Sequence, residues 1–140
     1  MLRAAAEAAQ QPGAPRLLAV TVLTSMDASE LDAVGVPASP SDQVLHLARL
    51  AWSCGIRGMV CSAEEVRMLR QELGPEALLV VPGIRPAGST THDQRRIATA
   101  AQAIGSGASM LVVGRPITRA SDPAGTVKDL FAEITRATRV

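Results

Sequence analysis

Lysine and aromatic residues are scarce in this chain of 140 residues, which contains one lysine, one tryptophan, one phenylalanine and no tyrosine. The lysine is Lys128, near the C-terminus, and the other 13 basic residues are arginine. A mechanism that needs a catalytic lysine at the end of a strand therefore has no candidate here. The net charge is only +1, which excludes a strong electrostatic footprint for nucleic acid or a membrane.

Cysteines and long apolar runs are also few. Cys54 and Cys61 have no metal-binding spacing, so we expect two small buried side chains without a disulfide. No apolar run approaches the roughly 20 residues that a membrane-spanning helix needs. The first residues include Glu7 where the apolar region of a signal peptide would lie. A cytoplasmic protein is expected.

The chain is instead typical of one globular α/β domain, with 47% hydrophobic and 19% charged residues. Apolar runs separated by helical patterns predict about four parallel strands with right-handed crossovers. The predicted strands are Leu17–Val22, Ile56–Cys61, Ala77–Val81 and Met110–Val113. The predicted helices are 1–11, a short one ending at Val34, 42–53, 63–73, 99–104 and a last one starting at Asp122-Pro123.

Side-chain caps are expected at several helix starts. Asp27 or Ser29 would cap the short helix, Ser41 the helix 42–53 and Ser62 the helix 63–73. Glu64 and Glu65 would then lie in the first helical turn, where the helix dipole favours acidic residues. The last helix is expected to present an apolar face that includes Val127, Leu130, Phe131 and Ile134, and Trp52 is expected in the core.

The last two predicted strands end in similar sequences. Ala77–Val81 leads to Gly83 and Arg85-Pro86, and Met110–Val113 leads to Gly114 and Arg115-Pro116. Glycine lets an oxyanion approach backbone N–H groups, and arginine offers a planar fork that fits phosphate. We therefore predict that Arg85 and Arg115 grip one phosphate, although a structural ion pair would also explain an arginine there.

Four strand–helix units form either a small open sheet or half of an eight-stranded barrel. A dinucleotide fold is disfavoured because no G-x-G-x-x-G follows the first strand. In (β/α)8 barrels the phosphate site usually follows the last two strands, which favours the C-terminal half of such a barrel. On the residues alone, Gln94 is either a phosphate donor or a solvated loop residue, and Thr24 and Ser25 either bind a ligand or cap a turn.

Four segments together resemble the bacterial orotidine 5′-phosphate decarboxylase family: LLAVTVLTSMD, VCSAEE, LLVVPGIRPAGSTTHDQRR and MLVVGRPITRASDP. The resemblance implies a (β/α)8 barrel that works as a homodimer, converts orotidine monophosphate to UMP and CO2, and uses no metal or organic cofactor. It assigns phosphate contacts to Arg85, Gln94 and Arg115, with the backbone of Gly114 beside them. It assigns a pyrimidine contact to Thr24, and the loop 83–98 resembles the family's closing phosphate loop.

The catalytic part of that family has no counterpart in this sequence. The family's Asp-x-Lys-x-x-Asp array and its upstream lysine are absent, and Lys128 lies elsewhere. The chain also begins inside a helical pattern, as one cut within a longer helix would. We therefore expect residues 1–140 to be a single partial domain, the C-terminal half-barrel, inactive alone. The alternatives are a non-catalytic nucleotide-phosphate-binding half-barrel that dimerises through its open edges, or another phosphosugar barrel enzyme.

Overall fold

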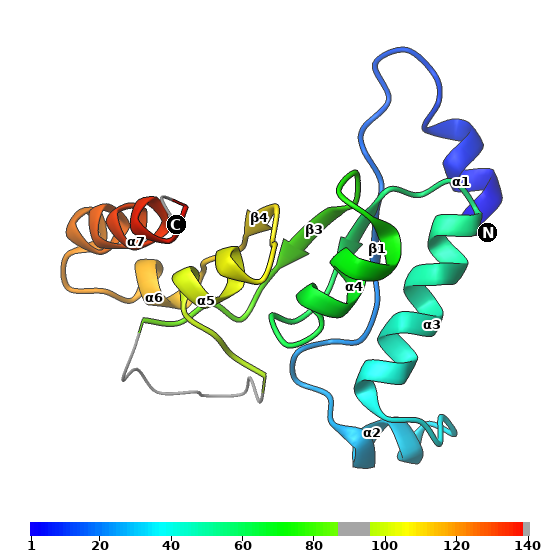
Figure 1. Cartoon of the computed structure of the whole chain (residues 1–140), viewed down its shortest axis with the longest axis horizontal. Coiled ribbons are helices and arrows are strands. Elements are labelled where there is room, and N and C mark those ends of the chain that lie inside the picture. Colours follow the sequence, from blue (N-terminus) through cyan, green and yellow to red (C-terminus); the bar gives the residue numbers. More distant parts are fainter. Residues whose placement is uncertain (87–95, 139–140) are drawn as a thin grey trace.

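The computed structural model describes residues 1–86 and 96–138, and helices alternate with strands along that part of the chain (Figure 1). Four short strands form the centre, and the two ends of the chain lie on opposite sides of the molecule in this view. The elements in order are α1 (Leu2–Ala8), β1 (Leu18–Val20), α2 (Ala28–Ala33), α3 (Pro40–Ser53), β2 (Gly58–Val60), α4 (Val66–Leu73), β3 (Leu78–Val81), α5 (Ala100–Gly105), β4 (Met110–Leu111), α6 (Arg115–Thr118) and α7 (Pro123–Ala137).

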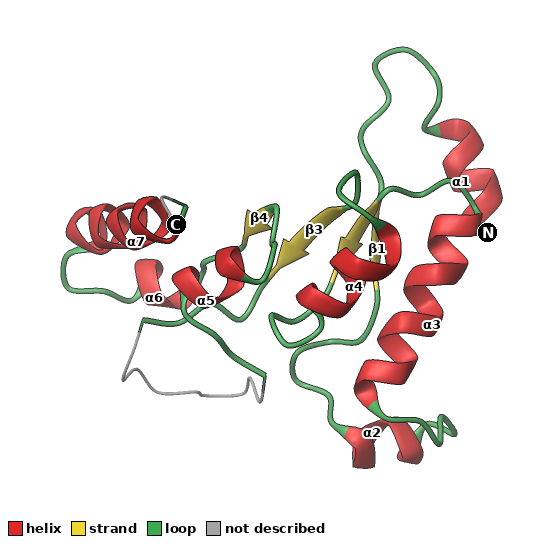
Figure 2. Ribbon diagram, viewed as in Figure 1, coloured by secondary structure: helices red, strands yellow, loops and turns green. Residues whose placement is uncertain are grey.

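The strands form one sheet in the order β1-β2-β3-β4, and every pair is parallel (Figure 2). Each strand pairs with the next one in the sequence, joined by a helical crossover, as in a barrel. The predicted α/β architecture of four parallel strands is therefore confirmed. All four carboxyl ends lie at one edge of the sheet, hereafter the carboxyl edge, and the opposite edge is the amino edge.

One face of the sheet is covered by helices. Met59 of β2 and Leu79 and Val81 of β3 are fully buried. They belong to the same apolar cluster as Val44 of α3 and Leu69 of α4. This face is the core, and its burial explains why the strands are apolar at these positions.

The other face of the sheet is exposed at its two outer strands. Val20 pairs in register with Val60, Val60 with Val80, and Val80 with Met110, so the four side chains form a row on one face. Val20 and Met110, which lie on the outer strands β1 and β4, are 58% and 55% exposed, respectively. In a closed barrel this row would face the packed interior, which eight strands fill with side chains.

The predicted caps are partly correct. Asp27 caps α2 as expected, and Thr99 and Asp122 also cap α5 and α7; each accepts a backbone N–H of the first turn. The prediction of Ser41 is wrong, because α3 begins at Pro40 and is capped by Ser39, whose Oγ accepts from the Asp42 N–H at 3.1 Å. Pro40 at the first helical position has no N–H to lose, which explains the earlier start.

The prediction for the start of α4 is wrong as well. The helix begins at Val66, after a turn that contains Glu64, and Glu65 precedes it without a side-chain cap. Ser62 is not a helix cap but hydrogen-bonds to Glu65 through both its backbone N–H and its hydroxyl. Glu64 and Glu65 therefore precede α4 instead of lying in its first turn. The Glu65 carboxylate can then contact residues outside the helix.

The last helix packs with only part of its predicted apolar face. Leu130 is buried, but Phe131 is 63% exposed. Helix α7 contacts α5, where Glu133 Oε1 accepts from the Ala101 N–H at 2.8 Å. Trp52 is only half buried, with the guanidinium of Arg57 lying 4.2 Å from its ring centroid. No helix in the described ranges combines the length and the apolar character needed to cross a bilayer.

Candidate functional site at the carboxyl edge

The predicted site residues that the structure describes all follow strands at the carboxyl edge. Thr24 comes after β1, Arg85 after β3, and Gly114 and Arg115 after β4. Because β3 and β4 are neighbours, the two arginines leave adjacent strand ends, while Thr24 lies across the sheet on the β1 side. Gln94 lies outside the described residues.

Arg85 is held in a buried position, with 5% of its surface exposed. Its backbone N–H donates to the Ala98 carbonyl at 2.9 Å, and its Nη1 donates to the Ile84 carbonyl at 2.8 Å. Ile84 and Ala98 also form a parallel bridge. Gly83, with a φ of 78°, makes the turn from β3 into this segment, a conformation that favours glycine. Segments 83–85 and 96–98 therefore lie side by side.

Arg115 begins a helix that the sequence analysis did not predict. Gly114 is the N-cap of the four-residue helix α6, and its carbonyl accepts from the N–H groups of Ile117 and Thr118 at 2.9 and 3.1 Å. Gly114 is exposed and Arg115 is half buried. The two segments that were expected to bind phosphate are thus the turn after β3 and the single helical turn α6 after β4.

Thr24 lies beside a small cavity on the opposite side of the edge. The cavity has a volume of about 260 Å³ and lies against the ends of the first three strands; its lining residues are Val20, Val22, Leu23, Thr24, Ser25, Val60, Cys61 and Pro82. Ligand pockets usually enclose roughly 300 to 1,000 Å³. The cavity is therefore slightly small for a complete ligand site, although it offers two hydroxyl groups among apolar walls.

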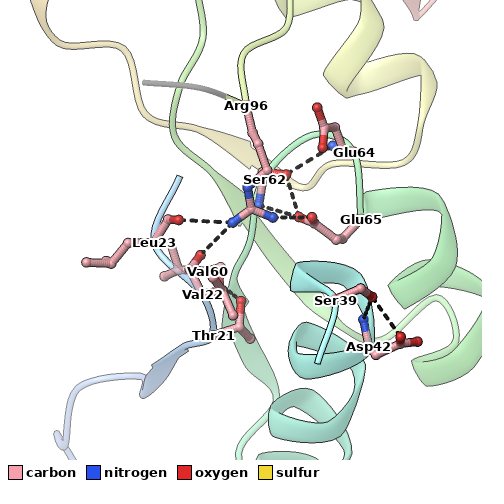
Figure 3. Close-up of polar contacts among 10 residues, drawn as sticks. All are labelled: Thr21, Val22, Leu23, Ser39, Asp42, Val60, Ser62, Glu64, Glu65 and Arg96. Carbon is pink, nitrogen blue, oxygen red and sulfur yellow. Dashed lines mark hydrogen bonds and ion pairs between the residues drawn. The ribbon is translucent and has the colours of Figure 1, made fainter. Parts of the chain in front are cut away.

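A buried polar group that the sequence does not predict joins these positions; it consists of Arg96, Glu65 and Ser62 and is hereafter the Arg96 cluster (Figure 3). The Arg96 guanidinium forms an ion pair with Glu65 through Nη1, and Nη2 donates to the carbonyls of Val22 and Leu23 at 3.2 and 3.0 Å. All three residues are at least nine-tenths buried. The cluster thus connects β1, β2 and the segment after β3.

No single sequence signal identified this cluster. Arg96 is the last residue of the Asp-Gln-Arg-Arg string, but its partner Glu65 is 31 positions away and was assigned to a helical turn. The apolar Leu-Val-Val runs located the strand ends, yet they did not show which charged residues meet there. The pairing depends on how the segment 96–98 returns to the sheet, which only tertiary structure reveals.

Cys61 precedes Ser62 of the Arg96 cluster, and its thiol is expected to be unreactive. Burial raises the pKa of its thiol to about 12, and the nearby Glu65 carboxylate adds to the effect. The thiol is therefore protonated at neutral pH and a poor nucleophile. Among the residues that the structure describes, no three His, Cys, Asp or Glu side chains gather as metal ligands would.

A larger cavity lies at the other end of the strands. Its volume is about 600 Å³, and it is bordered by α1, the segment before β1 and the amino ends of β2 and β3. Its walls include Arg16, Arg57 and Glu76, all of them exposed side chains. The carboxyl edge is the candidate site because of its buried polar groups and strand topology rather than its cavity size, since parallel α/β sheets bind ligands at the carboxyl ends of their strands.

Comparison with known proteins agrees with the sequence resemblance. Residues 1–130 match the model of the Orotidine 5'-phosphate decarboxylase / HUMPS family. The chain is 55% identical over 123 residues to orotidine 5'-phosphate decarboxylase of Gluconobacter oxydans, covering 88% of this chain and 52% of that protein. It is 51% identical over 135 residues to the Nitrosococcus oceani decarboxylase, covering 96% and 58% respectively.

The solved structures give the same result. The crystal structure of the decarboxylase from Lactobacillus acidophilus matches with a TM-score of 0.76 at 36% identity, over 96% of this chain and 58% of that one. The four parallel strands thus correspond to about half of a (β/α)8 barrel of this family. The chain spans between half and three-fifths of the length of these relatives, and it belongs to the orotidine 5′-phosphate decarboxylase / HUMPS family.

Proposed function

We propose that this chain is the C-terminal half of an orotidine 5′-phosphate decarboxylase and that it binds the phosphate and part of the base of orotidine monophosphate or UMP. One observation carries the proposal: the glycine–arginine turns that the family resemblance assigns to phosphate follow two adjacent strands, β3 and β4. Family membership supports the nucleotide as the ligand.

The proposed roles follow from the chemistry of each group. Arg85 and Arg115 supply guanidinium groups that neutralise the phosphate and fix its orientation through paired N–H donors. The Gly114 N–H and the Gln94 amide add neutral donors, of which Gln94 is assigned from the resemblance alone. Thr24, beside its small cavity, donates to or accepts from a pyrimidine edge.

The chemistry at the base requires groups that this sequence does not contain. The resemblance assigns proton transfer to an Asp/Lys array, whereas the only lysine here, Lys128, lies exposed on α7. In an enzyme of this kind, binding of the remote phosphate supports chemistry elsewhere on the substrate. We therefore propose that the chain provides this binding energy and that the 140 residues alone do not decarboxylate.

The test is a titration of the purified chain with UMP, inorganic phosphate and uridine, combined with a decarboxylation assay on orotidine monophosphate. We expect saturable UMP binding that weakens by about ten- to a hundredfold in Arg115→Ala, the usual effect of removing a hydrogen-bonded charge. No CO2 release is expected. A chain that binds none of the three ligands would overturn the proposed binding, and turnover abolished by Arg115→Ala would overturn the proposed inactivity.

A second candidate, a non-catalytic binding module that associates with another copy, is favoured by the exposed outer strands of the sheet. Val20 and Met110, at the two outer strands, are more than half exposed, and unpaired strand edges promote association. Sedimentation at several concentrations tests it. Association of the purified chain, together with UMP binding without turnover, would support this candidate, whereas a monomer at all concentrations would contradict it.

A further inference from the structure

Arg96 contacts the chain on both sides of the proposed nucleotide site. On the β1 side, its guanidinium donates to the carbonyls of Val22 and Leu23, and its backbone N–H donates to the Thr24 carbonyl at 3.4 Å. Three contacts therefore converge on the residues that lead from β1 to Thr24. These contacts fix the backbone of Thr24 and do not involve its hydroxyl.

On the β3 side, the same segment holds Arg85. The Ala98 carbonyl accepts from the Arg85 N–H at 2.9 Å, and the Ala98 N–H donates to the Gly83 carbonyl at 3.4 Å. Ala98 is two residues after Arg96. A displacement of Arg96 would therefore alter the position of Arg85 relative to Thr24.

The composition of the cluster indicates why an arginine is used. A buried cation needs a carboxylate partner, and Glu65, 1% exposed, supplies it from the turn before α4. Glu65 is itself fixed by the backbone N–H of Ser62 at 3.1 Å and by the Ser62 hydroxyl. A planar guanidinium can satisfy a carboxylate and two carbonyls at once, which a single ammonium group does less well.

We propose that Arg96 is a positioning residue that sets the separation between the base contact at Thr24 and the phosphate contact at Arg85. A nucleoside monophosphate carries its base and its phosphate at opposite ends, so both ends bind together only when the two contacts are correctly spaced. This inference rests on the proposed function. It adds a residue that touches neither end of the ligand but determines whether both are held together.

The test uses the full chain with the double substitution Arg96→Met/Glu65→Gln, which removes both buried charges and leaves an acceptor for Ser62. Replacing a buried ion pair by uncharged groups is usually well tolerated, and the unfolding transition verifies that the variant is folded. We expect UMP affinity to fall by about tenfold, comparable to the loss of one or two hydrogen bonds. Affinity for inorganic phosphate should be unchanged, because Arg85 and Arg115 are intact.

A matched control is Arg49→Met/Glu72→Gln, which removes the ion pair between α3 and α4 on the surface. UMP and phosphate affinities should both be unchanged there. The inference is wrong if Arg96→Met/Glu65→Gln binds UMP as tightly as the unmodified chain does. It is also wrong if the affinities of this variant for UMP and for phosphate fall by the same factor. If the unmodified chain fails to bind UMP, the proposed function is wrong and the inference falls with it.

If the double variant does not fold, Arg96→Lys provides the same measurement with the charge beside Glu65 retained. Its UMP affinity should fall while its phosphate affinity does not, because lysine cannot maintain the contacts to both carbonyls. Equal affinity of Arg96→Lys and the unmodified chain for UMP would contradict the role proposed for Arg96.

Discussion

The two edges of the sheet are each held together by an arginine, but the two arginines are satisfied in different ways. At the amino edge, Arg70 of α4 donates to the carbonyls of Gly74, Pro75, Ala77 and Gly107 at 2.8 to 3.2 Å, and to the Ser109 hydroxyl. It is half buried and its acceptors are neutral. At the carboxyl edge, Arg96 is 7% exposed and pairs with a buried carboxylate.

The difference is that only the carboxyl edge buries a charged pair of side chains among the described residues. Neutral carbonyls near solvent suffice to connect β3 and β4 at the amino edge. The carboxyl edge instead contains the buried polar side chains of the described core: Thr24, Ser62, Glu65, Arg85 and Arg96. Buried ion pairs add little net stability over apolar packing. The gathering of these buried polar side chains at the carboxyl edge therefore fits positioning for a ligand better than a stabilising role.

The largest effect on stability is expected from Arg96→Met alone. This substitution leaves the Glu65 carboxylate buried without its cation, which typically costs about 3–5 kcal/mol. Urea denaturation should show this loss in the free energy of unfolding, and the added Glu65→Gln substitution should restore most of it. A single substitution as stable as the unmodified chain would show that the ion pair is not buried as described.

For Arg70→Met we expect a smaller decrease in the free energy of unfolding, about 2 kcal/mol. The carbonyls that lose their donor are neutral, and they lie closer to water than the Glu65 carboxylate does. Titration of the same variant with UMP separates an effect on stability from an effect on binding. Arg70→Met should lower the free energy of unfolding without weakening UMP binding. A fall in UMP affinity in this variant would contradict the functional difference between the two edges.

The buried thiol gives a pH-dependent prediction for the carboxyl edge. The pKa of Cys61 rises from 9.0 to about 12 in the folded chain. Folding therefore favours the protonated thiol, and this contribution is complete below pH 9 and declines as the pH rises towards 12. The free energy of unfolding should fall more steeply with pH in the unmodified chain than in Cys61→Ala, by up to about 1.4 kcal/mol per pH unit above pH 9. Equal slopes would contradict the burial of this thiol.

The smallest effect is expected from Arg49→Met. Its guanidinium lies 2.7 Å from Glu72, but the two side chains are 58% and 35% exposed. The hydrogen bond from Arg49 lowers the pKa of Glu72. The ion pair therefore stabilises the folded chain at a pH above the usual pKa of a glutamate, and this stabilisation decreases as the pH falls below that value. Water and salt screen exposed pairs. The free energy of unfolding at pH 7 should therefore not change measurably, and a loss comparable to that of Arg96→Met would contradict the contrast between buried and exposed pairs.

The sequence was sufficient to predict the sheet of four parallel strands and the strand ends that the candidate site residues follow. Apolar runs marked the strands, and glycine followed by arginine marked the ends of β3 and β4, because these signals are local. The Arg96–Glu65 pair could not be predicted in this way, since it joins residues from different strand–helix units. The start of α3 could have been predicted from Pro40, which favours the first helical position, and the short helix α6 has Pro116 in the same first turn.

The most direct test of the account is to follow the backbone amide signals of the chain by NMR during a titration with UMP. We predict that the signals of Thr24, Arg85, Gly114 and Arg115 shift together at the carboxyl edge, while those of Arg16, Arg57 and Gly58 around the larger cavity do not. Shifts confined to the larger cavity at the amino edge, or no shifts at saturating UMP, would contradict the placement of the nucleotide site.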